Sequence, residues 1–181
     1  MTSTTAITDR ARRRRQGPAR RGGAAGVAPV VAVATTAAFA AGGLLTQTVV
    51  VPTWQGMEPR AFLAHFRRYG PITGATLFPI ELTSTLLLAG ATSSAVRRRE
   101  PARVTWALAT AAMIGTVLLL PIHFAPANRA LLDPDFPVQD VPSELRAWRS
   151  WNWARTGLAV LATGLSCAAL TADHPHDRSR I

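Results

Sequence analysis

Five polar side chains interrupt the long apolar stretches of this sequence, and their chemistry stands out. They are Gln47, Glu81, His123, Asn152 and Arg155. A carboxylate or an imidazole can accept a proton, while a guanidinium and amides can hold a negatively charged oxygen. A charge inside a bilayer is costly, so it usually faces a partner or a cavity. These residues therefore predict either a functional pocket or a set of contacts that holds helices together.

The elements that must position these side chains are four long apolar stretches. A helix needs about 20 apolar residues to cross the hydrocarbon core of a bilayer. Each stretch meets that length, and together they leave no room for a separate soluble domain. The sequence therefore predicts a single all-α domain over residues 27–172, an integral membrane four-helix bundle in contact with lipid. The expected spans are residues 27–51, 72–96, 104–124 and 153–172.

The polar ends of the chain have a different composition. Residues 1–26 are rich in Arg and contain Gly and Pro, which predicts a disordered basic tail. Residues 173–181 form a second, short polar tail. The apolar run continues well past Ala38-Phe39-Ala40, a sequence like a signal-peptide cleavage site, which favours a retained first span.

The connectors between the spans carry helix-ending and helix-starting signals. We expect Pro52 to end the first span and Pro79 to kink the second. The amphipathic stretch Pro59–Tyr69 is expected to lie in the membrane interface. The Pro-rich and acidic stretch Ala125–Val141 is expected to be a loop, and Ser143 is a candidate N-cap for the last helix.

The distribution of charge predicts the orientation in the membrane. All 20 basic residues are Arg, and thirteen of them lie in the two tails or in the connector 97–103. The other two connectors hold fewer Arg and five of the ten acids. The positive-inside rule then places both termini in the cytoplasm of a cell membrane. No base-reading fold accompanies the basic tail, so nucleic acid is not an expected partner. The single Cys167 excludes an intramolecular disulfide and a thiolate metal cluster.

The five polar residues fall in the same half of the expected bundle, which predicts a pocket. Arg155 is the natural counter-ion for Glu81, because a bidentate pair limits the cost of burying both charges. Trp148 lies on the same helical stripe as Asn152 and Arg155.

Two segments near this pocket resemble a known family. They read LPIHFAPANRALL (120–132) and ELRAWRSWNWARTGLAVLA (144–162). The motif Pro126-Ala-Asn128-Arg129-Ala-Leu131, followed by Trp148, Asn152 and Arg155, is similar to the anthrone-oxygenase-like family, the domain of unknown function 1772. The four-span plan is similar over residues 27–172. The resemblance implies a membrane oxidoreductase that oxidises an apolar aromatic or polyketide-like metabolite with molecular oxygen.

Roles can be assigned to the pocket residues under this hypothesis. His123 or Glu81 would be the base, and Arg155 and Asn152 would hold the oxyanion. The expected ligand-binding residues are Gln47, Asn128, Trp148 and Trp151.

Two alternatives remain open. Iron or copper could be held by His123, Glu81 and His65, although the sequence contains no local metal-binding motif. Alternatively, the chain is a non-enzymatic membrane protein that binds a lipid or small ligand or assists a transporter. A transporter proper is not expected, because the sequence has no inverted repeat and no pair of broken helices.

Overall fold

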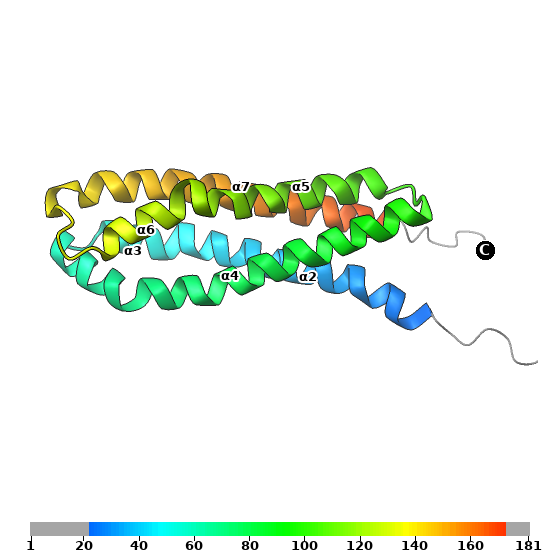
Figure 1. Ribbon diagram of the computed structural model, residues 1–181, viewed down its shortest axis with the longest axis horizontal. Helices are drawn as coiled ribbons and strands as arrows, with labels where there is room; N and C mark the ends of the chain where they lie inside the picture. The colour runs from blue at the N-terminus through cyan, green and yellow to red at the C-terminus, as the bar shows by residue number, and fades with distance from the viewer. Residues whose placement is uncertain (1–21, 173–181) are drawn as a thin grey trace, which may run out of the picture.

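The structure is a computed structural model that describes residues 22–172, and its regular elements over that range are all helical (Figure 1). The predicted all-α four-helix bundle is confirmed. Each of the four long helical segments is called a rod below. The first rod combines α2 (Gly22–Leu45), a π turn η1 (Thr46–Val50) and α3 (Val51–Gln55). The second rod is α4 (Pro59–Arg98). The third combines α5 (Arg103–Leu119), a π turn η2 (Leu120–Phe124) and α6 (Ala125–Leu132), and the fourth combines η3 (Val138–Asp140) and α7 (Val141–Ala172). Each rod is long and apolar enough to cross a membrane.

The sequence predicted that the first span ends at Pro52, but the helix continues beyond this residue. The backbone N–H of Val51 bonds to the carbonyl oxygen of Thr46, five residues earlier, and the helix continues to Gln55. Pro52 then lies in the first turn of α3, where a residue without an N–H is tolerated. The predicted tail also ends earlier than expected, because α2 begins at Gly22. The rest of that tail and residues 173–181 lie outside the described residues.

The amphipathic stretch Pro59–Tyr69 is helical, and its expected place in the membrane interface stays a prediction. It forms the first turns of α4, continuous with the second span. The Glu58 side chain caps this helix by accepting a hydrogen bond of 3.0 Å from the Ala61 N–H. The apolar face of the stretch, with Phe62 and Phe66, is buried against the other rods.

The stretch Ala125–Val141 is mostly helical rather than a loop, so that prediction was also wrong. The π turn η2 lets the third rod continue into α6, with Pro126 in its first turn. Only the short segment between α6 and η3 is irregular. Helix α7 already begins at Val141, and the Ser143 hydroxyl donates to the Asp140 carbonyl (2.7 Å) instead of capping the helix.

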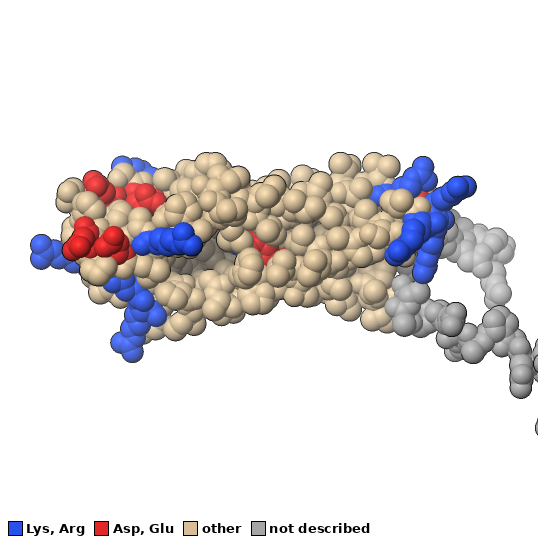
Figure 2. Space-filling view, in the orientation of Figure 1, with Lys and Arg blue, Asp and Glu red and all other residues tan. Residues whose placement is uncertain are grey.

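The ends of the bundle differ in charge. The turn between α4 and α5 carries Arg97, Arg98, Arg99 and Arg103, and we call this the basic end. Helix α2 begins and α7 ends near it (Figure 1). The opposite, distal end carries acids as well as Arg, and a wide belt almost without charge separates the two ends (Figure 2). Such a belt fits the hydrocarbon core of a bilayer.

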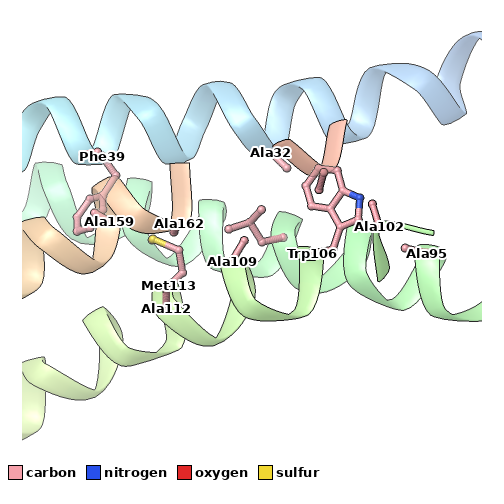
Figure 3. Packing of buried hydrophobic residues seen from close by; sticks show 13 residues of the cluster. Ala32, Phe39, Ala95, Ala102, Trp106, Ala109, Ala112, Met113, Ala159 and Ala162 are labelled. Carbon is pink, nitrogen blue, oxygen red and sulfur yellow. The ribbon is translucent and has the colours of Figure 1, made fainter. Parts of the chain in front are cut away.

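The half of the bundle near the basic end has a core made mainly of Ala. Helix α2 packs on α4 and α7, and α5 packs on the same two helices. The buried Ala residues let the helix backbones approach closely, and Trp106 fills the space near the basic end (Figure 3). Near the distal end a second cluster is built from larger side chains. Its largest members are Trp54, Phe62, Phe66, Phe124 and Trp148.

Candidate functional site

A cavity lies where α4 separates from the rest of the bundle. Between Phe66 and Glu81, both buried, no residue of α4 is buried, although the segment 67–80 makes about four helical turns. Two helix-disrupting residues, Pro71 and Pro79, lie in this segment, and α4 arches outward along it (Figure 1). The cavity beneath α4 has a volume of about 460 Å³. Figure 2 shows the corresponding hollow in the face between α4 and α6.

The walls of the cavity are mainly apolar and aromatic. The aromatic wall residues are Phe39, Trp54, Phe66, Phe78, Phe124 and Trp148. The Trp148 ring contacts Trp54 and Phe124 edge-on, with ring centroids 5.4 and 5.3 Å apart. Its indole N–H donates to Asn128 Oδ1 (3.1 Å), which fixes both side chains at the distal end of the cavity. The other polar wall residues are Thr46, Thr73, Asn152, Arg155 and Thr156.

Arg155 lines the cavity, and its positive charge is paired with Glu81, which lies behind the cavity wall. Arg155 Nε donates to Glu81 Oε1 (3.2 Å), and Arg155 Nη2 donates to Glu81 Oε2. The carboxylate is fully buried, and the guanidinium carbon lies 5.1 Å from the ring centroids of both Phe39 and Phe124. These contacts confirm the predicted Glu81–Arg155 pair and hold the guanidinium plane in one orientation. Arg155 lines the cavity, and among the described residues its Nη1 makes no hydrogen bond.

A second buried pair lies next to the ion pair. Asn152 Nδ2 donates to Gln47 Oε1 (2.7 Å), and both residues are almost fully buried. Asn152 lines the cavity, whereas Gln47 lies behind it. Two polar atoms of this layer have no partner among the described residues, namely Gln47 Nε2 and Thr156 Oγ1. The Thr156 hydroxyl points at α2, where a Cβ added to Gly43 would come within 2.9 Å of it.

Both π turns border the cavity, and the sequence reasoning missed them. Thr46 comes from η1, and Leu120 and Phe124 come from η2. A π turn inserts one extra residue into a helix and so rotates the side chains that follow, which is why such turns are frequent at functional sites. The signal in the sequence was a proline in or just after each turn, Pro121 and Pro52, inside an otherwise apolar run.

The structure brings together most, but not all, of the predicted site residues. Arg155, Asn152, Trp148 and Asn128 line the cavity, and Glu81 and Gln47 are hydrogen-bonded directly behind it. The sequence reasoning missed most of the aromatic wall, because nothing in the spacing of Phe39, Phe78 or Trp54 separates them from ordinary core residues.

His123 and Trp151 are not part of the cavity wall. Their rings stack on each other, with centroids 5.1 Å apart and an interplanar angle of 19°. The expected base His123 is therefore outside the site. The His65 ring lies next to Tyr69 instead, with ring centroids 4.8 Å apart and an interplanar angle of 44°. Among residues 22–172 no three His, Cys, Asp or Glu side chains come together, so the suggested iron or copper ligands His123, Glu81 and His65 are not assembled.

Comparison with protein-family models, with curated proteins and with solved structures gave no match to this chain. The resemblance to the anthrone-oxygenase-like family therefore stays a prediction from the two motifs.

Proposed function

We propose that this protein binds an apolar, flat, carbonyl-bearing molecule within the membrane, of the aromatic or polyketide-like class. The observation that carries the proposal is Arg155 at the wall of an aromatic cavity of about 460 Å³, with one guanidinium nitrogen, Nη1, that makes no hydrogen bond among the described residues. That volume lies in the range of small-molecule sites, which are mostly apolar with a few placed polar groups. Edge and face contacts with Phe124 and Trp148 suit a planar aromatic ligand.

The charge balance of the site favours a neutral oxygen over an anion. Glu81 already neutralises Arg155, so a carboxylate or phosphate ligand would bring an uncompensated negative charge into an apolar cavity. A carbonyl oxygen accepts the N–H of Nη1 without that cost. A hydrogen bond from a charged donor is also stronger than a neutral one, especially away from water.

A second candidate function is an oxidoreductase of the anthrone-oxygenase type. An anthrone carries a methylene opposite its carbonyl, and loss of one methylene proton gives an enolate whose negative charge lies largely on the oxygen. Reaction with molecular oxygen would convert the methylene to a carbonyl. One atom of the oxygen molecule stays on carbon, and the other leaves as water with the two methylene hydrogens. The observation that favours this reading is that Arg155 is positioned to stabilise such an enolate.

The base in this second reading would be Glu81, the only acid next to the wall among the described residues. Both of its oxygens are held by Arg155, so it can accept a proton only if Arg155 turns toward the ligand oxygen.

One experiment tests both functions. The protein is reconstituted in nanodiscs and incubated with 9,10-anthraquinone for binding and with anthrone for oxygen uptake. The Arg155→Lys variant, which keeps the charge but loses the bidentate geometry, is compared with Arg149→Lys on the exposed surface. We expect binding that only Arg155→Lys weakens. Binding without oxygen uptake above the protein-free rate would exclude the oxygenase, and no binding would exclude both functions.

The proposed location is a cell membrane, with the basic end and both termini in the cytoplasm. The Arg residues of the α4–α5 turn and the mixed charges of the distal end support this orientation (Figure 2). In a Cys167→Ser background, a membrane-impermeant maleimide applied to intact cells should label Asp135→Cys but not Arg98→Cys. Labelling of Arg98→Cys but not of Asp135→Cys would show the opposite orientation.

A further inference from the structure

The cavity is bounded on one side by residues 67–80 of α4, none of which is buried. Leu77 of α4 lies against α2, so close that a Cβ added to Gly42 would come within 3.1 Å of it. This contact closes the cavity on the α2 side. On the other side, α4 faces α6 and the η2 turn, and the nearest lining residues there are Leu120, Ala125 and Asn128. The hollow in Figure 2 lies on this side.

This opening lies at the edge of the hydrocarbon belt. Gly74 is 23 residues from Arg97 along α4, which corresponds to about 35 Å at 1.5 Å per residue. Glu81 is 16 residues from Arg97, about 24 Å. Since a hydrocarbon core is about 30 Å thick, the cavity spans the boundary between acyl chains and headgroups on the distal side. A molecule dissolved in that leaflet lies at the level of the opening.

Gly74 lies at the cavity wall next to free space. It lines the cavity, yet a Cβ added there would meet nothing within 4 Å. Gly70, one turn earlier, differs, because a Cβ there would touch the Phe66 ring at 3.1 Å. Gly70 therefore serves close packing, whereas Gly74 borders free space. A side chain at position 74 therefore has free space around its Cβ.

We infer that the ligand enters sideways from the bilayer leaflet at the distal end, between α4 and α6, and that Gly74 keeps this route open. The inference rests on the proposed binding function and adds a class to it, a molecule dissolved in the membrane rather than one delivered from water. The exposed flank of α4 and the exposed Phe78 at the cavity wall are then in contact with acyl chains.

The test uses a matched pair of substitutions and two probes. Gly74→Trp places a bulky ring at the opening. Gly90→Trp places the same ring on α4 where a Cβ also meets nothing, but away from the cavity. The probes are free 9,10-anthraquinone and a phosphatidylcholine with an anthraquinone at the end of one acyl chain, which cannot arrive through water. The protein is held in nanodiscs of phosphatidylcholine and phosphatidylglycerol.

We expect the wild type and Gly90→Trp to bind both probes and Gly74→Trp to bind them about tenfold more weakly or not at all. The tethered probe decides the route, because its chain can leave the cavity only toward lipid. If the wild type binds free anthraquinone but not the tethered form, lateral entry is wrong and the binding function stands. Equal binding by Gly74→Trp and Gly90→Trp would show that Gly74 does not border the route. If the wild type binds neither probe, the proposed function falls and the inference falls with it.

Discussion

The two halves of this bundle use the same four rods for different purposes. Near the basic end the core is made of Ala residues with a few large side chains, and α4 packs against its neighbours. Near the distal end the core is made of aromatic side chains, and α4 has no buried residue over residues 67–80. Small residues bring membrane helices together, whereas prolines and large rings hold them apart.

The two halves also differ in the polar contacts between their helices. In the Ala-rich half a side-chain hydrogen bond between α4 and α5 joins the hydroxyls of Thr92 and Thr110 (2.8 Å). The layer next to the cavity instead holds an ion pair and an amide pair. A close-packed half can therefore stabilise a neighbouring half that contains a hollow and buried charge.

The largest expected effect is a loss in the free energy of unfolding when the Glu81–Arg155 ion pair beside the cavity is broken. Arg155→Met leaves the fully buried Glu81 without its partner, so we expect a loss of about 3–5 kcal/mol in the free energy of unfolding. Arg149→Met, which removes only an exposed hydrogen bond to Gln55, should change it by about 0.5 kcal/mol or less. Denaturant titration in detergent measures both. A double variant, Glu81→Met with Arg155→Met, should recover most of the loss. Equal losses for the two single variants would contradict the role of the pair.

A smaller effect on the free energy of unfolding is expected when the same Ala→Leu substitution is made in each half. Ala109→Leu adds volume at a fully buried position in the Ala-rich core and should lower the free energy of unfolding by about 1–3 kcal/mol. Ala75→Leu adds the same volume at an exposed position beside the cavity and should change it by about 0.5 kcal/mol or less. Thermal unfolding of the two variants in one detergent provides the comparison. A comparable loss in both would mean that the hollow is filled in the native protein.

The fold was predictable because span length and apolar composition set it. The four rods and the Glu81–Arg155 pair follow from the bilayer's demand for long apolar helices and for paired charges. The helix ends were not predictable in this way. Pro52 and Pro126 were interpreted as breaks, but each lies in a first turn where a missing N–H costs little.

The candidate site was predictable only in part, because sequence spacing does not fix the rotation of a helix after a π turn. His123 lies within η2 and turns toward Trp151, whereas its neighbour Phe124 turns toward Arg155. The sequence analysis assumed an uninterrupted α-helix and therefore predicted that His123 faces the interior of the bundle. The hollow itself depends on how far α4 bends at Pro71 and Pro79, which no single segment of the sequence encodes.

A weaker polar contact tests the distal end of the cavity. Trp148→Phe removes the indole N–H and leaves Asn128 Oδ1 without its donor, so we expect a loss of about 0.5–1.5 kcal/mol. Trp153→Phe, at a half-exposed position facing outward, serves as the control and should have less effect. The comparison is read from thermal unfolding. A larger loss for Trp153→Phe would mean that anchoring at the membrane interface outweighs the hydrogen bond.

The smallest expected effect has the opposite sign. The hydroxyl of Thr156 is buried without a partner among residues 22–172, so Thr156→Val should leave the free energy of unfolding unchanged or raise it by up to about 1 kcal/mol. Thr116→Val is the matched control, because the Thr116 hydroxyl donates to the Met113 carbonyl (2.8 Å) in an equally buried position, and its loss should be destabilising. If Thr156→Val destabilises as much as Thr116→Val, the Thr156 hydroxyl has a native partner. Because Thr156 and the neighbouring Gly43 both line the cavity, a molecule held there would be the partner to look for, and the polar part of the site would then extend beyond Arg155.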